Sequence, residues 1–119
     1  MDETEKRSAI IGACLEMTAS GLNKGTSGNV SLRDGADMLI TPSAVPYAAM
    51  TPDMIARLPL AGNGDWSGPK KPSSEWRFHM DIFNARPDIQ AIVHAHPVYC
   101  TAFAMLREDL VATHYMIAA

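Results

Sequence analysis

Two short runs with strand character, residues 29–32 and 37–41, are separated by a segment that contains the pair Asp34-Gly35. An Asp-Gly pair between such runs is typical of a β-hairpin, because both residues tolerate the positive φ angles of a tight turn. A hairpin joins two antiparallel neighbours. The sequence therefore predicts an antiparallel pair of strands in the first third of the chain.

Helical and strand-like segments alternate along the rest of the chain. Periodicity, β-branched runs and proline breaks predict helices over residues 3–22, 74–85 and 97–107, and further strands over 54–60, 89–93 and 110–119. A loop rich in glycine and proline fills residues 61–72, and Pro59 places the strand over 54–60 at a sheet edge. The alternation predicts a mixed α/β domain. The first helix is expected to turn one face inward, with Ile10, Ile11, Cys14, Leu15 and Met17.

The composition narrows the classes of function. With 119 residues, 47% of them hydrophobic, and a formal charge of −3, the chain is expected to be one soluble domain or part of one. No stripe of basic residues is present to neutralise phosphates, which argues against a nucleic-acid partner. No run is long and apolar enough to span a membrane. Only two cysteines, Cys14 and Cys100, are present, so a cytoplasmic protein without a disulfide framework is expected.

His94 and His96 are the first candidates for chemistry. They follow the apolar run 89–93, which Pro97 closes shortly afterwards, so this run is predicted to be a short buried strand. Positions i and i+2 of a strand project to the same side, which brings both imidazoles within reach of one metal ion. Zinc and the neighbouring divalent transition metals bind imidazole nitrogen readily. An isolated H-x-H pattern also occurs by chance, so other motifs of the chain are needed to distinguish a metal site from a chance occurrence.

A glycine-rich segment, Lys24-Gly25-Thr26-Ser27-Gly28-Asn29, precedes the first strand of the hairpin. Glycines permit a backbone that turns successive N–H groups toward one point, and Thr26, Ser27 and Asn29 add polar side chains. Such a concavity suits a phosphate or another oxyanion. The alternative is an ordinary turn, because Gly, Ser and Asn favour turns for local reasons. The segment matches neither the dinucleotide-binding glycine motif nor the P-loop.

The segment Pro72-Ser73-Ser74-Glu75 begins a predicted helix. Serine is a favoured N-cap and glutamate suits the first turn, so helix capping is one explanation. The same helix start, with free N–H groups and two hydroxyls, can also bind an anion. Glu75 would then lie beside that anion and could act as a metal ligand or a general base. His79, one turn further along, is expected to pack under the loop rather than to bind a metal.

His114 and Tyr115 lie on the last predicted strand, where neighbouring side chains face opposite ways, so at most one of them joins a common pocket. A tyrosine near a cationic metal can serve as a general acid, because the positive charge favours its ionised form. A tyrosine that only packs is the alternative.

Five motifs follow one another along the chain: Gly25-Thr26-Ser27-Gly28-Asn29-Val30-Ser31, Ile40-Thr41-Pro42-Ser43, Lys71-Pro72-Ser73-Ser74-Glu75, His94-Ala95-His96-Pro97 and His114-Tyr115-Met116-Ile117. In this order and near this spacing, they resemble the class II aldolase/adducin family, and most of all its L-fuculose-phosphate aldolase branch. The resemblance runs from about Ile10 to the end of the chain. It implies an α/β/α fold, with a central, mainly antiparallel sheet flanked by helices.

The resemblance further implies an enzyme that uses a divalent zinc ion to cleave a ketose 1-phosphate to dihydroxyacetone phosphate and an aldehyde. His94 and His96 correspond to zinc ligands. Glu75 corresponds to a glutamate that binds zinc in the resting site and then moves the proton at the carbon beside the substrate carbonyl. Tyr115 corresponds to a proton donor that reaches across a subunit interface in a fourfold homotetramer. The family's phosphate pocket matches Thr26, Gly28, Asn29, Ser43, Ser73 and Ser74.

Two departures from the family pattern bear on these expectations. Ala44 stands where the family usually has glycine, and alanine resists positive φ, so the phosphate loop is expected to differ. The family's third zinc ligand, a histidine, lies beyond the last residue of this chain, which ends in the apolar run Met116-Ile117-Ala118-Ala119. We therefore expect residues 1–119 to be a single incomplete domain that is inactive as an isolated fragment.

Other reactions and a non-catalytic role remain as alternatives. Members of this superfamily also catalyse epimerisation, dehydration or decarboxylation, and adducin binds the cytoskeleton without catalysis. Glu75 favours the aldolase branch over the epimerase branch, which carries an aspartate at this position. The intact pair His94 and His96 argues against an adducin-like scaffold, which has no need of metal ligands.

Overall fold

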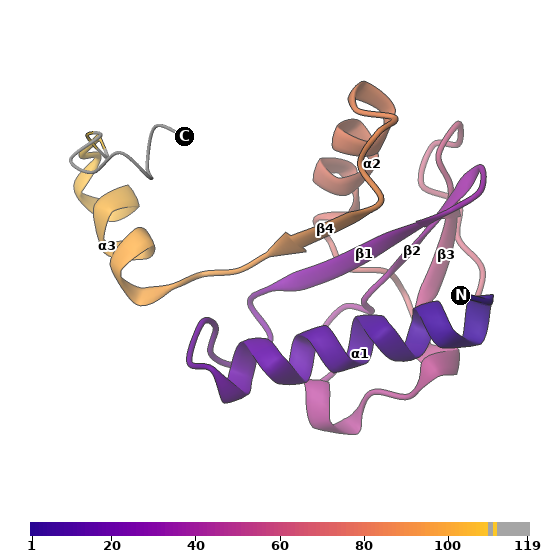
Figure 1. Ribbon diagram of the computed structural model, residues 1–119, viewed down its shortest axis with the longest axis horizontal. Coiled ribbons are helices and arrows are strands. Elements are labelled where there is room, and N and C mark those ends of the chain that lie inside the picture. Colours follow the sequence, from indigo (N-terminus) through magenta and orange to yellow (C-terminus); the bar gives the residue numbers. More distant parts are fainter. Residues whose placement is uncertain (110, 112–119) are drawn as a thin grey trace.

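A four-stranded antiparallel sheet, in the order β3-β2-β1-β4, is the centre of the computed structural model, which describes residues 1–109 and 111 (Figure 1). Two short 3₁₀ turns, Tyr47–Ala49 and Pro52–Met54, precede the third strand. The helices and strands of the described residues are α1 (Glu3–Ala19), β1 (Asn29–Asp34), β2 (Asp37–Ile40), β3 (Ala56–Pro59), α2 (Trp76–Ala85), β4 (Ala91–His94) and α3 (Val98–Leu106).

Both faces of the sheet carry a hydrophobic layer, because the side chains of β2 alternate. Leu39 packs with Ile10 and Cys14 of α1 on one face, whereas Met38 and Ile40 pack with α2 on the other. Figure 1 shows α1 and α2 on opposite sides of the sheet. The predicted mixed α/β fold, with an antiparallel sheet between helices, is therefore confirmed.

The predicted hairpin is present as β1 and β2, but its turn lies one residue later than expected. Asp34 pairs with Asp37 at the end of the ladder, so the two turn residues are Gly35 and Ala36. Gly35 supplies the positive φ angle, 63°, that the turn needs. β1 also extends two residues beyond the predicted end at Leu32, up to the turn itself.

α1 ends at Ala19, three residues before the predicted end, and Gly21 follows with a φ of 75° as the predicted stop signal. Asp2 caps the helix start: its carboxylate accepts a hydrogen bond from the N–H of Glu5, and the Glu5 carboxylate accepts one from the Asp2 N–H. The predicted inner position of Leu15 is wrong, because its side chain is 45% exposed.

The strand predicted over 54–60 is shorter in the structure. Pro52 begins a 3₁₀ turn, so β3 starts only at Ala56. Pro59 ends β3, which forms one edge of the sheet as predicted. The helix expected from Ser74 begins two residues later, at Trp76.

The prediction of a buried strand over 89–93 is wrong in both bounds and burial. β4 spans Ala91–His94 and is the other edge of the described sheet, where Val93 remains 54% exposed. Within the described residues β4 pairs only with β1, so its outer side gains no cover from a neighbouring strand. Apolar content reports hydrophobicity, whereas burial depends on which elements surround the strand.

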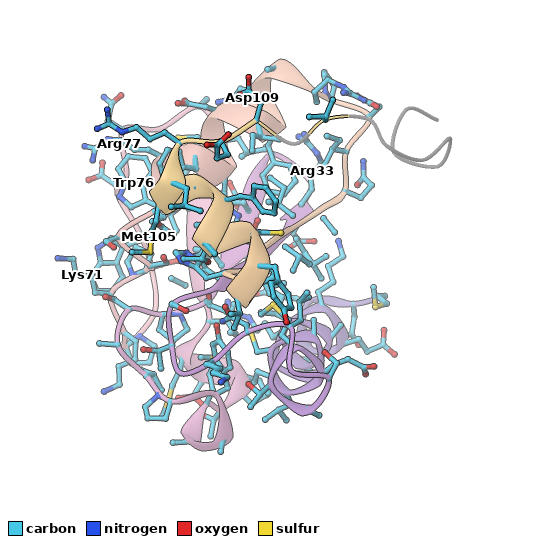
Figure 2. All side chains as sticks on the ribbon, turned by 90° about the vertical axis from the view of Figure 1, so that its left-hand side faces the viewer. Arg33, Lys71, Trp76, Arg77, Met105 and Asp109 are labelled. Atoms are coloured by element: carbon cyan, nitrogen blue, oxygen red, sulfur yellow. The ribbon has the colours of Figure 1, made fainter. Side chains whose placement is uncertain are left out.

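α3 follows β4 after a short extended connection and stands away from the sheet (Figure 1). Pro97 is its N-cap rather than its first helical residue. Met105, labelled in Figure 2, is 80% exposed. The strand predicted over 110–119 lies outside the described residues except for Val111. Among the helices that are described, none is long and apolar enough to cross a membrane.

Candidate functional site

The two histidines of the H-x-H motif lie at the point where β4 ends. His94 is the last residue of the strand, and the centroid of its ring lies 4.8 Å from that of His96. The backbone N–H of His96 donates a hydrogen bond to Asn23 Oδ1 at 2.8 Å, which ties this exit to the start of the glycine-rich loop. The structure thus holds the two imidazoles side by side, although only His94 belongs to the strand and His96 follows its end.

Glu75 brings a carboxylate to the same place. It occupies the N-cap position of α2, but its side chain makes no capping hydrogen bond, so the capping explanation does not describe its role. Instead Glu75 Oε2 lies 2.8 Å from Nδ1 of His94. The hydroxyl of Ser73 accepts a hydrogen bond from the backbone N–H of Glu75 at 3.3 Å. The carboxylate is therefore free to face the histidines.

Glu75, His94 and His96 form a donor set that a divalent metal can use. One potential ligand atom from each lies within 4.8 Å of the other two. Two imidazole nitrogens and one carboxylate oxygen suit zinc and related divalent ions. The first two residues are half-buried and His96 is exposed, so an ion would remain open to solvent or substrate on one side. These residues fit the metal that the sequence predicted.

Asn29 joins the carboxylate to the histidines. Strand pairing places it directly opposite His94. Its Nδ2 donates a hydrogen bond to Glu75 Oε2 at 2.6 Å, and its Oδ1 lies 3.3 Å from Nδ1 of His94. Burial raises the pKa of Glu75, but the hydrogen bond from Asn29 and the neighbouring His94 outweigh it and hold this pKa below its usual range. The carboxylate is therefore ionised at neutral pH.

A polar cavity of about 230 Å³ adjoins the carboxylate. Two segments that are distant in sequence meet there, the glycine-rich loop and the start of α2, together with the turn that follows β2. Each offers hydroxyls or backbone N–H groups, which are suitable donors for an oxyanion. All six residues predicted for phosphate binding line this cavity, along with Glu75: Thr26, Gly28, Asn29, Ser43, Ser73 and Ser74.

Two backbone hydrogen bonds hold the turn after β2 against the start of α2. The N–H of Ser43 donates to the carbonyl of Lys71, and the N–H of Ser73 donates to the carbonyl of Thr41, each at 2.9 Å. Ala44 follows in this turn with a φ of 56°. Alanine thus adopts the positive φ that it resists: the backbone takes the left-handed geometry that glycine favours, at a cost in strain.

Gly28 has a steric role in addition to its place in the cavity. A Cβ atom at this position would lie 2.6 Å from the carbonyl oxygen of His94 and 2.7 Å from Asn23 Nδ2. The carbonyl of Gly28 also accepts a hydrogen bond from the buried hydroxyl of Tyr47 at 2.7 Å. The glycine therefore allows the loop and the exit of β4 to approach closely, which keeps the cavity beside the histidines.

One site-forming residue, Asn23, was not singled out from the sequence, and the contacts of a second, His79, differ from those expected. Asn23 is 1% exposed, and its Oδ1 accepts hydrogen bonds from both His96 and Ser27. His79 is also 1% exposed, but it contacts Ser31 and Asn29 of β1 rather than packing under the loop. The sequence held one sign of both residues, because each is polar and lies within a few positions of a motif. A polar side chain that becomes buried needs a hydrogen-bond partner. Tyr115 and His114 lie outside the described residues.

The chain matches a family described as Class II Aldolase and Adducin N-terminal domain over residues 8–119. The L-fuculose phosphate aldolase of Escherichia coli (strain K12) is 50% identical over 119 residues, which are all of this chain and 54% of that protein. The 5-methylthioribulose-1-phosphate/5-deoxyribulose-1-phosphate aldolase of Rhodospirillum rubrum is 47% identical over 112 residues, 94% of this chain and 50% of the relative.

Solved structures agree with these sequence matches. An L-fuculose 1-phosphate aldolase superposes with a TM-score of 0.88 at 38% identity, covering 96% of this chain and 54% of that one. The L-fuculose-1-phosphate aldolase from Thermus thermophilus gives a TM-score of 0.70 at 32% identity, covering 84% of this chain and 50% of the other. The chain thus spans about half the length of the curated relatives it matches.

Proposed function

Because this chain belongs to the class II aldolase and adducin family, we propose that it contributes to a metal-dependent sugar-phosphate aldolase. The reaction is the cleavage of a ketose 1-phosphate to dihydroxyacetone phosphate and an aldehyde. One observation carries this proposal: a cavity lined by oxyanion donors opens beside an ionised carboxylate that faces two histidines. The relatives named above act, by their names, on different phosphorylated sugars, which agrees with a pocket that recognises the phosphate.

The proposed phosphate site is the polar cavity. Thr26, Asn29, Ser43, Ser73 and Ser74 offer side-chain donors, and Gly28 offers close access to the backbone. The phosphate does not react, so its binding energy can position the distant carbon atoms that do. The start of α2 contributes a favourable dipole for the anion.

His94, His96 and Glu75 are proposed to hold zinc or another divalent ion. Such an ion supplies Lewis-acid polarisation of a carbonyl oxygen. Glu75 also has a second role, because it carries the proton that ends on the carbon beside the carbonyl of dihydroxyacetone phosphate. Its place at the N-cap of α2, beside both the phosphate cavity and the two histidines, supports this role.

Further parts of the proposal concern the protein as a whole. Tyr115 is proposed to take the proton from the hydroxyl that becomes the aldehyde oxygen during cleavage, and to act as the proton donor to that oxygen in the reverse, addition direction. It would act across a subunit interface of a homotetramer in the cytoplasm. Residues 1–119 are proposed to be one incomplete domain of this enzyme. No nucleic acid or membrane is proposed as a partner.

A substitution of Glu75 tests the proposal. In the full-length protein, Glu75→Gln keeps the shape of the side chain but cannot take up a proton. We expect the kcat for cleavage of L-fuculose 1-phosphate to fall by roughly 10²–10⁴-fold, the usual contribution of general acid–base catalysis. Binding of a phosphorylated substrate analogue, measured by calorimetry, should persist.

Glu16→Gln is the matched control, because Glu16 is an exposed glutamate on α1 that does not line the cavity. It should leave kcat unchanged. Full activity of the Glu75→Gln variant contradicts the assigned proton transfer. A wild-type protein that binds zinc but cleaves no ketose 1-phosphate favours a dehydratase, decarboxylase or epimerase of the same superfamily, and one without zinc favours an adducin-like scaffold.

A further inference from the structure

We propose that His79 is a positioning residue for the catalytic carboxylate: its Nε2–H holds the amide of Asn29 in the one orientation that presents an N–H group to Glu75. The inference rests on the proposed function of Glu75 and goes beyond it. Nε2 of His79 lies 2.5 Å from Asn29 Oδ1, and Asn29 Nδ2 lies 2.6 Å from Glu75 Oε2. Two short contacts in series thus join a fully buried ring to the site.

The proton on His79 is assigned by its neighbours. Asn29 Oδ1 is a carbonyl oxygen and carries no hydrogen, so the short contact requires a proton on Nε2. Nδ1 lies 2.6 Å from the hydroxyl of Ser31, which can donate to it. Burial, with a smaller contribution from His94, lowers the pKa of His79 to about 4, so the ring is neutral at physiological pH and carries only the Nε2 proton.

The opposite orientation of the Asn29 amide is unfavourable at two contacts. It would turn the carbonyl oxygen of Asn29 toward the Glu75 carboxylate, placing two acceptors face to face. It would also turn the amide NH₂ toward Nε2 of His79, which already carries a proton. The tautomer of His79 and the orientation of Asn29 therefore support each other, and together they direct the N–H group of Asn29 toward the Glu75 carboxylate.

The hydrogen bonds that run from Ser31 through His79 to Asn29 lie in the protein interior. Ser31, Asn29 and His79 are 0%, 4% and 1% exposed. Buried polar groups are costly unless every one is paired, and here the serine hydroxyl, both ring nitrogens and both amide atoms have partners. An apolar side chain would fill the space but could not orient Asn29.

The placement on α2 makes the link short. Glu75 and His79 are four residues apart, on adjacent turns at the start of the same helix, and Asn29 faces both from β1. Without the hydrogen bond from His79, the Asn29 amide keeps only its contact to Glu75 itself and the longer 3.3 Å contact to Nδ1 of His94, so Glu75 loses a firmly oriented donor. Because Asn29 is one of several donors around the phosphate cavity but is the donor that contacts Glu75 Oε2, we expect this change to alter kcat more than KM.

The test compares His79→Leu with His79→Gln in the full-length protein. Leucine removes the donor, whereas the glutamine amide can donate to Asn29 Oδ1 in place of Nε2. We expect His79→Leu to lower kcat for ketose 1-phosphate cleavage by roughly 10–100-fold, the usual effect of losing a residue that orients a metal or catalytic group, with KM changed less than about threefold. His79→Gln should regain most of this loss.

Phe83→Leu is the control for packing alone, because Phe83 is buried on the same helix, eight residues beyond Glu75, in the apolar cluster between α2 and the sheet. It should lower thermal stability and leave kcat unchanged. Equal losses of kcat in the leucine and glutamine variants, or a loss that Phe83→Leu reproduces, would overturn the inference.

A second measurement does not depend on activity. The ¹⁵N chemical shifts of the His79 ring in the wild-type protein, recorded with a metal chelator present, should show a protonated Nε2 and an unprotonated Nδ1 at neutral pH. A protonated Nδ1 overturns the positioning role alone. Absence of aldolase activity in the wild-type protein overturns instead the proposed function, so the two failures are distinguishable.

Discussion

At the scale of single residues, Ala44 is the position where backbone strain and the candidate site coincide. Its φ of 56° lies in the left-handed region, and it lines the cavity beside Ser43. For a residue with a Cβ atom this conformation costs roughly 1–2 kcal/mol. The neighbouring hydrogen bonds between the turn after β2 and the start of α2 hold the chain in place despite this cost.

The substitution Ala44→Gly should therefore stabilise the protein. Relief of strain exceeds the extra unfolded-state entropy of glycine, so the free energy of unfolding should rise by about 0.5–1 kcal/mol in urea titrations. Ala48→Gly is the matched control, because Ala48 lies in the 3₁₀ turn Tyr47–Ala49 with an ordinary φ, and it should lower the stability. A loss of stability in both variants would show that Ala44 is not strained.

At the scale of elements, an ion-pair cluster holds α1 against the hairpin. Arg57 of β3 contacts carboxylates from α1, β1 and β2: Glu3 at 3.0 Å, Asp37 at 2.5 Å, and Asp34. Lys6 of α1 adds a second contact to Asp34 at 2.7 Å. The hydrogen bond from Lys6, together with Arg57, lowers the pKa of Asp34 below its ordinary value of 3.8, although burial opposes this. Arg7 and Arg57 lower the pKa of Glu3 below 4.5.

This cluster predicts a loss of stability in acid. A carboxylate whose pKa is lower in the folded protein stabilises it above the ordinary pKa, and this contribution disappears as the pH falls through the lower, folded value. The free energy of unfolding should therefore decrease as the pH falls below about 4. Arg57→Met should cost about 1 kcal/mol at neutral pH, as expected for a partly exposed network, and should weaken the acid dependence.

Lys70→Met is the control for the acid titration, since Lys70 is an exposed residue of the loop between β3 and α2. It should leave both the stability and its pH dependence unchanged. If Arg57→Met unfolds with the same acid dependence as the wild-type protein, the cluster does not determine that dependence.

At the scale of the whole molecule, the candidate metal site exists only after folding. Glu75 comes from the start of α2, whereas His94 and His96 come from the exit of β4, so an unfolded chain does not hold the three together. A ligand that binds only the folded state stabilises it by mass action. Zinc at 100 times its Kd should raise the free energy of unfolding of the full-length protein by about 2.7 kcal/mol.

The double substitution His94→Ala/His96→Ala should abolish this stabilisation and the uptake of zinc, while the far-ultraviolet circular dichroism stays the same. Cys100→Ser is the control, because Cys100 lies near His96 but is not one of the three donors. It should bind zinc as the wild-type protein does. Stoichiometric zinc in the double variant would show that the metal binds elsewhere.

The sequence by itself determined the elements and the chemical content of the candidate site. Local rules located the hairpin around Gly35, the stop of α1 near Gly21 and the edge strand that ends at Pro59, because turn and proline preferences act over a few residues. The five ordered motifs also selected residues that the fold brings together: Thr26, Gly28, Asn29, Ser43, Ser73, Ser74 and Glu75 around one cavity, with His94 and His96 beside Glu75.

Only the tertiary structure decided how those residues act on one another. Strand pairing sets Asn29 opposite His94, and the packing of α2 on β1 brings His79 to Asn29; neither contact has a local signature. Burial also depends on the assembly, which is why β4 is apolar in sequence yet half-exposed at the sheet edge. The physical reason is one of range: turns and caps are determined by neighbours along the chain, whereas burial and side-chain orientation are determined by neighbours in space.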